Sequence, residues 1–253
     1  MTVKAISTTR NILKFEGLQP HIYWQRFAML LSLSVVIATM GLLRNSGAVV
    51  IAAMLIAPLM TPILGIAAAM VMGWSRRAFL LLLTVCIAAS ASVALAWVLV
   101  FVSDVPRGII IPSEVIARTD HGTEELIVAL AAGIAGAYVQ IQRSEISLLP
   151  GAAIGVSLVP PLCAAGILLY YGEMDDAYEA ALLFATNLGA IILSACAVYV
   201  YSSRSAFRAR LHKRVVGFSA GLIAITGFLG LIAAQLIAST VNRYHETLSL
   251  IHI

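Results

Sequence analysis

The sequence predicts an all-α integral membrane protein of about seven transmembrane helices, and two observations support this fold class. Of the 253 residues, 61% are hydrophobic and only 11% are charged, against about 45–50% and 25% in soluble domains. The apolar residues also form long runs, and a helix needs about 20 of them to cross the ~30 Å hydrocarbon core of a bilayer. A soluble domain of this composition could not cover its core with polar surface.

Seven apolar runs define the expected spans. They cover residues 27–43, 48–72, 78–102, 126–142, 147–171, 178–201 and 215–238. Residues 1–26 then form a cytoplasmic N-terminal segment, residues 103–125 the longest outer loop and residues 239–253 an outer C-terminal tail. The first run is not followed by a small-residue cleavage site, so we expect a retained span and not a signal peptide.

Basic residues predict the orientation of the chain through the positive-inside rule. With a cytoplasmic N-terminus, most of the 16 Lys and Arg residues fall on the inner side, and all acidic residues except Glu16 and Glu145 fall on the outer side. We therefore expect the N-terminus inside and the C-terminus outside. The pI near 9.1 then reflects sidedness, and no basic face with interleaved aromatic residues indicates nucleic-acid binding.

The outer loop contains a short predicted helix. Pro112 followed by Ser113 and Glu114 is typical of a helix start with Ser113 as the N-cap. Glu114 and Arg118 stand four residues apart, so their side chains can pair on one helix face. Two interpretations stay open: a surface ion pair that contributes less than ~1 kcal/mol, or an ion pair at the outer rim of a transport pathway.

Prolines distinguish the second and the fifth span. The second contains Pro58 and Pro62, and the fifth contains Pro160 and Pro161. Because proline removes an i→i−4 hydrogen bond and clashes with the preceding turn, two prolines close together predict a broken helix in each span. Thr61 before Pro62 predicts a fresh helix start with Thr61 as its N-cap. Backbone freed at membrane depth must face protein or a water-filled cavity.

The two proline-containing spans stand at equivalent positions of an internal repeat. A shift that places Pro58 on Pro160 aligns the second span with the fifth and the third with the sixth. Repeat one (27–102) and repeat two (126–201) each hold three spans, so the second is inserted upside down relative to the first. The seventh helix (215–238) lies outside the repeat. Inverted repeats with discontinuous helices at equivalent positions are typical of secondary transporters.

Four segments form a specific set of motifs. They are SEVIART at 113–119, LIVALAAGIAGA at 126–137, GAAIGVSLVPPLCAAG at 151–166 and NSGAVVIAAMLIAPLMTP at 45–62. Together they resemble the prokaryotic membrane family named domain-of-unknown-function family 389, over about residues 28 to 202. The resemblance implies this architecture and a place in the prokaryotic cell (inner) membrane, but no established activity. Family members often carry an additional soluble domain, which we do not expect in this chain.

Ionisable groups inside spans mark proton relays and ion pathways, and the centres of all seven expected spans contain no Asp, Glu, Lys, Arg or His. We therefore expect no carboxylate-driven proton pump. The five histidines have no second ligand at metal spacing, the three cysteines form no CxxC pair, and no hydrolase, P-loop or dinucleotide-binding motif occurs. We therefore expect no metal, no cofactor and no enzymatic activity.

The polar groups that remain at depth form the candidate substrate-binding site. They are the proline-broken backbones and Pro58, Thr61, Pro62, Ser157, Pro160, Pro161 and Asn187, and Thr186 is a further polar residue at this depth outside the site. Two helix N-termini restarting at the proline breaks would point partial positive charge at one region, which favours a small anion or carboxylate. As structural alternatives, Ser and Thr hydroxyls bond back to their own helix, and the Asn side chain ties helices together.

Three functions stay open at this stage. The first is a secondary transporter of a small anionic or polar solute, the second an oligomeric channel or pore gated by the broken helices. The third is a structural or signalling membrane scaffold, which the absence of buried charge favours. The expected partners are the lipid bilayer, an unidentified solute or ion, and a second copy of the chain, with no nucleic acid.

Overall fold

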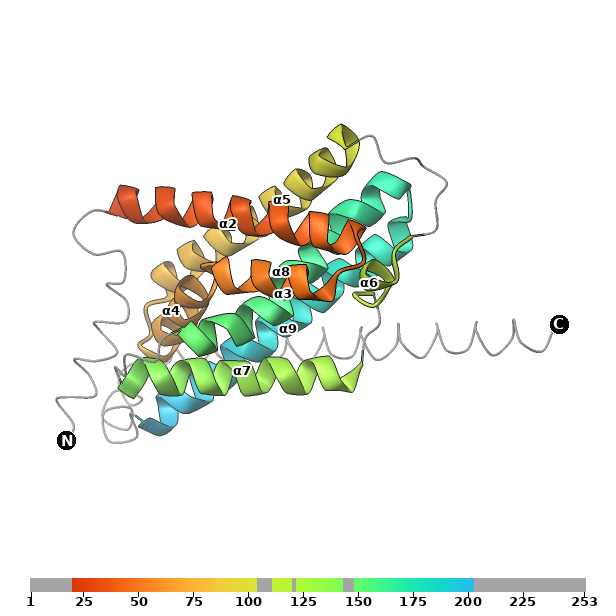
Figure 1. Ribbon diagram of the computed structural model, residues 1–253. Coiled ribbons are helices and arrows are strands. Elements are labelled where there is room, and N and C mark those ends of the chain that lie inside the picture. Colours follow the sequence, from red (N-terminus) through yellow and green to blue (C-terminus); the bar gives the residue numbers. More distant parts are fainter. Residues whose placement is uncertain (1–19, 104–110, 120–121, 143–147, 203–253) are drawn as a thin grey trace.

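The computed structural model describes residues 20–103, 111–119, 122–142 and 148–202, and these ranges are helical with no strand (Figure 1). The helices in chain order are α2 (Pro20–Leu43), α3 (Gly47–Ile56), α4 (Met60–Val71), α5 (Ser75–Val102), α6 (Ser113–Ile116), α7 (Thr123–Gln142), α8 (Leu148–Tyr171) and α9 (Met174–Ser202). The expected all-helical fold class is therefore confirmed for the described part of the chain.

Four of these helices, α2, α5, α7 and α9, are each long and apolar enough to cross a membrane. The pair α3 and α4 meets the same test as one bent span, which gives up to five spans by length and composition. The described part of α8, Leu158–Tyr171, is a shorter apolar helix. The expected seventh span, residues 215–238, lies outside the described residues, so the count of seven stays a prediction, as does the internal repeat.

The first helix starts earlier than the apolar run suggests. α2 begins at Pro20 rather than at residue 27, and proline is well suited to the first position of a helix because its fixed φ is already helical. Tyr23 packs edge-on against Trp24 at 5.1 Å, and Trp24 against Phe27 at 5.3 Å. These aromatic contacts stabilise the helical part of the expected N-terminal segment (1–26).

Successive spans, with α3 and α4 taken together as one bent span, run in opposite directions, so their connections gather at two ends of the bundle (Figure 1). One end contains α6, the 44–46 turn after α2 and the 172–173 turn after α8, and we call it the α6 end. The opposite end contains the start of α2, the 72–74 turn before α5 and the end of α9. Asn45, Gly73 and Gly172 have positive φ of 53°, 70° and 90°, the conformation that commonly ends a helix.

α8 is the central helix of the bundle, in contact with α2, α3, α5, α7 and α9. Every residue from Leu158 to Leu168 is buried. At Gly166 an added Cβ would lie 2.5 Å from the Val93 carbonyl oxygen and 2.7 Å from Ala96 Cβ, so α5 and α8 nearly touch. Such close packing through small residues is the usual basis of helix association in membranes.

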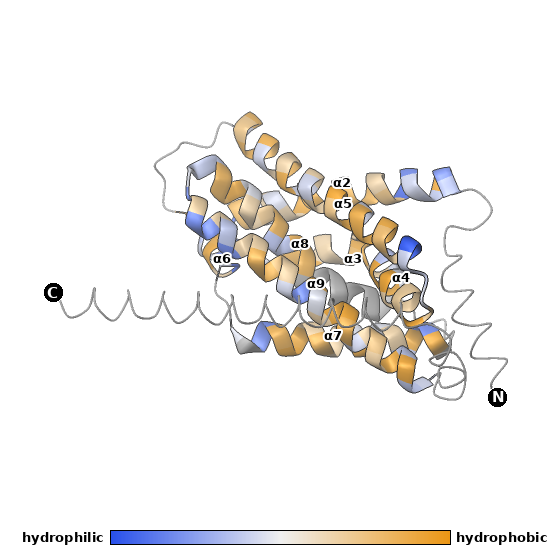
Figure 2. Cartoon of the chain, turned by 180° about the vertical axis from the view of Figure 1, so that it is seen from behind, coloured by the Kyte–Doolittle hydropathy of each residue, from blue (hydrophilic) through white to orange (hydrophobic). Residues whose placement is uncertain are grey.

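The outward faces are apolar instead of polar (Figure 2). On α5, Phe79 is 64% exposed and Ile87 is 62% exposed, and on α2 Met29 is 66% exposed. Large exposed apolar surface of this kind needs a partner other than water. A lipid bilayer supplies it, and the helical backbone can enter a bilayer because its hydrogen bonds are internally satisfied.

The prediction of a broken fifth span is wrong. α8 continues from Leu148 to Tyr171 with Pro160 and Pro161 inside it. Each proline removes one backbone hydrogen bond and costs about 3 kcal/mol in an exposed helix. Here both prolines are buried between neighbouring helices, and a continuous helix keeps the flanking side chains packed, which offsets that cost.

Candidate functional site

The second expected span is divided into α3 and α4, which meet at an angle of 55°. Ala57, between them, has φ −63° and ψ 121°, which is the extended conformation that a residue before a proline prefers. Pro58 follows directly. α3 therefore ends where Pro58 forces the preceding residue, Ala57, out of the helical conformation.

The helix start after this bend lies two residues earlier than predicted. α4 begins at Met60, and Leu59 occupies the N-cap position without a side-chain hydrogen bond. The prediction of Thr61 as N-cap is therefore wrong, because Thr61 is the second residue of the helix. Pro62 is the third residue, where its missing N–H costs little, since the first four N–H groups of a helix have no partner within it. The backbone N–H of Ile63 donates to the Leu59 carbonyl at 3.3 Å.

The α3–α4 bend contains both buried and partly exposed residues. Ala57, Leu59 and Pro62 are buried, whereas Pro58 and Thr61 are partly exposed. The polar hydroxyl of Thr61 therefore lies at an accessible position within an otherwise apolar segment. α3 and α4 contain no charged side chain, so the polar character of this region comes from Thr61 and from the backbone at the start of α4.

On α8 and α9 the expected site residues have structural surroundings. Pro160 and Pro161 are buried in the continuous helix, and the side chain of Ser157 lies outside the described part of the structure. Thr186 donates its hydroxyl to the carbonyls of Leu182 and Leu183, both at 3.0 Å, which is the structural alternative for a threonine in a span. Because α8 does not restart after its prolines, the expected pair of convergent helix N-termini is also wrong.

Packing between helices brings the remaining candidates into one region. α3 contacts α8, and α4 contacts both α8 and α9, so the helices that carry Pro58, Pro161 and Asn187 form one packed group. Asn187 is buried on α9. On the same helix, Cys196 Sγ lies 3.6 Å from the carbonyl oxygen of Ala67 in α4.

Ser34 is a buried polar residue that the sequence did not single out. Its hydroxyl donates to the carbonyl of Ala53 at 2.8 Å, which links α2 to α3. A serine in an apolar run usually bonds within its own helix, so no local pattern distinguishes this hydroxyl from the others. The bond fixes α3 to α2 just before the bend.

At the α6 end, Glu114 and Arg118 lie as the spacing predicts. Arg118 Nη2 is 3.6 Å from Glu114 Oε2, and Arg118 Nη1 is 4.0 Å from Glu125 Oε1 of α7. The two side chains of the first pair are 22% and 30% exposed, so the pair is partly screened by solvent. α6 begins at Ser113 with Pro112 in the N-cap position, so the prediction of Ser113 as N-cap is wrong.

Asn45 connects this ion pair to the α2–α3 turn. Its side-chain oxygen accepts the Ser113 hydroxyl at 3.0 Å and the Glu114 backbone N–H at 2.9 Å. The acceptor for the start of α6 therefore comes from 69 residues earlier in the chain. Gly47 faces the Glu114 carboxylate, and an added Cβ there would lie 3.1 Å from Oε1. The sequence Asn45-Ser46-Gly47 is a typical turn signal that could have marked this position.

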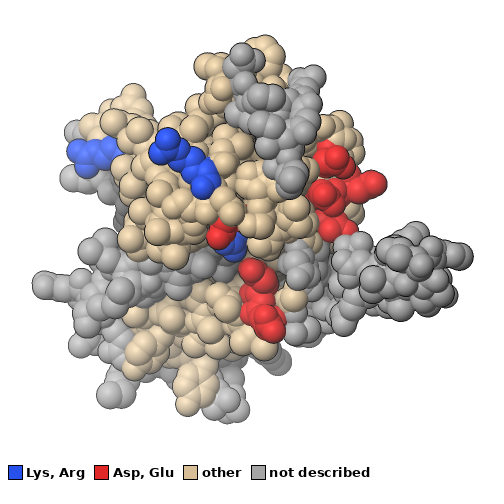
Figure 3. Space-filling view, turned by 45° about the vertical axis from the view of Figure 1, so that its right-hand side comes forward, with Lys and Arg blue, Asp and Glu red and all other residues tan. Residues whose placement is uncertain are grey.

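The described acidic residues gather at the α6 end of the bundle, together with Arg44 and Arg118. All described acidic residues belong to α6, to the first turn of α7, to the first two turns of α9 or to the turn before α9: Glu114, Glu124, Glu125, Glu173, Asp175, Asp176 and Glu179. The opposite end has Arg26, Arg76 and Arg77. In Figure 3 most of the acidic side chains (red) lie away from most of the basic side chains (blue). Within the described ranges no group of three or more His, Cys, Asp or Glu could hold a metal ion.

These features define the class: a helical membrane protein with one bent span packed against a central helix. The chain belongs to the family described as "Domain of unknown function (DUF389)", which matches residues 54–193. It is 27% identical over 185 residues to an uncharacterized protein of Methanocaldococcus jannaschii. That match covers 71% of this chain and 55% of the relative, so the chain spans about half of the relative's length. No solved structure matches the chain.

Proposed function

We propose that the chain forms the membrane-embedded part of a secondary transporter for a small anionic or polar solute, with its site at the α3–α4 bend. The observation that carries this proposal is the partly exposed Thr61 beside Pro58, in a segment whose other residues are largely apolar. Discontinuous helices near the bilayer midplane form the substrate sites of many secondary transporters.

The electrostatics at the bend favour an anion over a cation. The start of α4 presents N–H groups that have no acceptor within the helix, and it carries about half a positive charge from the helix dipole. No acidic side chain occurs on α3 or α4 to neutralise that charge or to bind a cation. A carboxylate or a small inorganic anion is therefore the chemical class that this site suits.

The inverted repeat and the orientation belong to the same proposal. Residues 27–102 and 126–201 form the two repeats, and the N-terminus lies in the cytoplasm, because the opposite end holds only basic residues among the described charges. The substrate site lies in repeat one, which contains the bend. An alkaline phosphatase fused after Ile253 should then be active outside, and an inactive fusion would contradict the orientation.

Uptake by reconstituted vesicles tests the transport function. Small carboxylates and inorganic anions are offered with an imposed Na⁺ or proton gradient, and saturable uptake against the solute's own gradient is expected for one class. Thr61→Ala should raise the half-saturation concentration about fivefold, the equivalent of one lost hydrogen bond of about 1 kcal/mol. Thr84→Ala is the matched control, because the Thr84 hydroxyl donates to Leu80 of its own helix.

Two outcomes would contradict the transporter. Stepwise single-channel currents in planar bilayers would favour the channel or pore. Absence of any driven flux would favour a membrane scaffold. One structural observation supports the scaffold: Pro160 and Pro161 are packed in the bundle, and the helix that contains them is not broken. Neither function requires a catalytic residue or a cofactor.

A further inference from the structure

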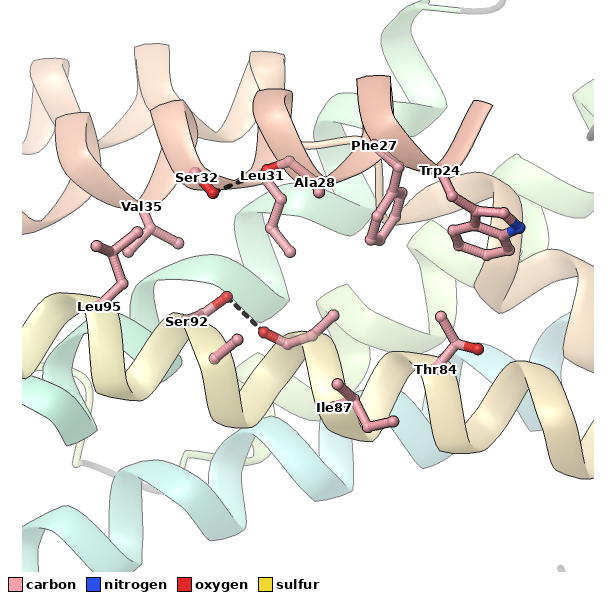
Figure 4. A pocket seen from close by; sticks show the side chains of 12 residues that line it. Trp24, Phe27, Ala28, Leu31, Ser32, Val35, Thr84, Ile87, Ser92 and Leu95 are labelled. Carbon is pink, nitrogen blue, oxygen red and sulfur yellow. Dashed lines mark hydrogen bonds between the residues drawn. The ribbon is translucent and has the colours of Figure 1, made fainter. Parts of the chain in front are cut away.

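A groove runs along the surface between α2 and α5 (Figure 4). Its volume is about 470 Å³, and its lining extends from Trp24 to Val35 on α2 and from Thr84 to Leu95 on α5. Each stretch covers eleven helical steps, or about 16 Å, close to the ~15 Å of hydrocarbon in one leaflet of a bilayer. Ile87, in this lining, is 62% exposed, so the groove is open to the outside of the bundle.

The groove presents almost no available polarity. Its three hydroxyl groups belong to Ser32, Thr84 and Ser92, and each donates to the carbonyl four residues earlier in its own helix at 2.8 Å. Figure 4 shows two of these bonds. The other lining residues are apolar or aromatic. A ligand of this groove must therefore be apolar along its whole length.

The end of the groove at Trp24 is flanked by positive charge. Arg76 and Arg77 lie in the first turn of α5, and Arg77 stands seven residues before Thr84, which places it on the same face of α5 as the groove lining. The described residues at this end of the bundle include no acid. Arg76 precedes Thr84 by eight helical steps, or about 12 Å, which places it at the depth of lipid headgroups when the lining residues lie in hydrocarbon. Trp24 lies at this end of the groove, and tryptophan is enriched at the border between the headgroups and the hydrocarbon of a membrane.

We propose that the groove binds one acyl chain of an anionic phospholipid, whose headgroup lies beside Arg76 and Arg77. Basic residues near a membrane surface attract anionic headgroups, and each methylene buried in the groove adds to the binding. This inference does not depend on the transport function.

Native mass spectrometry of the full-length chain tests the proposal. The chain is reconstituted in vesicles with equal amounts of phosphatidylglycerol and phosphatidylethanolamine and then extracted in a mild detergent. One retained phosphatidylglycerol per chain is expected. Ala91→Phe, which fills the groove from α5, should lower its occupancy about tenfold, the effect of losing about two buried methylene groups. Ala28→Phe should do the same from α2.

The matched control is Ala94→Phe, which adds the same side chain at an exposed position of α5 outside the groove lining, and it should retain the lipid. Equal retention by the Ala91→Phe and Ala94→Phe variants would overturn the proposal, as would a wild-type chain without lipid. The Arg76→Gln, Arg77→Gln double variant should lose the preference for phosphatidylglycerol. A wild-type chain without that preference would overturn the assignment of an anionic headgroup.

Discussion

The α3–α4 pair and α8 are two proline-containing segments with opposite structures. Before Pro58 the chain leaves the helix, and Ala57 takes the extended conformation. At Pro160 and Pro161, which are adjacent in sequence, α8 stays helical. The segment with adjacent prolines is the intact one, so the number and spacing of prolines do not decide whether a span breaks.

The surroundings of the two segments explain this difference. α8 contacts every other described helix and is buried over Leu158–Leu168, so a bend there would remove many packing contacts. α3 lies at the edge of the bundle, and Ile51 and Leu55 on it are 56% and 62% exposed. Here the one exposed face of α3 leaves the helix less enclosed than α8, and the observed bend follows the steric preference of the residue before proline.

Gly166→Ala in α8 should have the largest effect on stability. The new Cβ would lie 2.5 Å from the Val93 carbonyl oxygen, so α5 and α8 must separate, at a cost of about 1–3 kcal/mol. Thermal unfolding in detergent measures the loss. Ala52→Leu on the exposed face of α3 is the control and should change stability by less than about 0.5 kcal/mol. Equal losses would contradict the difference between a packed helix and an edge helix.

Replacing the prolines should change stability in opposite directions in the two segments. Pro161→Ala restores a backbone hydrogen bond and removes a steric clash, and together these stabilise the folded state by about 3 kcal/mol. The loss of two buried methylene groups destabilises it by about 1.6 kcal/mol. A gain of about 1 kcal/mol is expected. Pro58→Ala should lose up to about 1 kcal/mol, because the unfolded chain gains freedom while the extended Ala57 needs no relief. Changes of the same sign, measured by thermal unfolding, would refute the comparison.

The sequence was sufficient to predict the helices and their class. A bilayer requires apolar runs of a fixed length, so the six runs within the described ranges each correspond to a helix or, for the second, a bent pair. Which proline-containing span is broken could not be predicted, because this depends on the burial of Pro160 and on the exposure of α3. The inter-helix bonds of Ser34 and Asn45 depend on partners far away in the chain, and no local pattern reveals such partners.

The ion pair of Glu114 and Arg118 should give the smallest effect. A double-mutant cycle with Glu114→Gln and Arg118→Gln should yield a coupling free energy of about 0.5 kcal/mol, since both groups are partly exposed and Glu125 also attracts Arg118. The coupling should fall further in 1 M salt, where the Debye length is only ~3 Å. Simple additivity at low salt would show two independent surface charges.

Cysteine accessibility tests the central claim most directly, that the α3–α4 bend is open to water and α8 is not. In a background without the three native cysteines, Thr61→Cys should react with a small hydrophilic thiol reagent, because thiolate formation needs water. Ala165→Cys, at a position in α8 that is 2% exposed, should stay unlabelled, while Glu173→Cys in the turn before α9 should label fully. An inert Thr61→Cys beside a fully labelled Glu173→Cys would contradict the claim and remove the main support for a transport site.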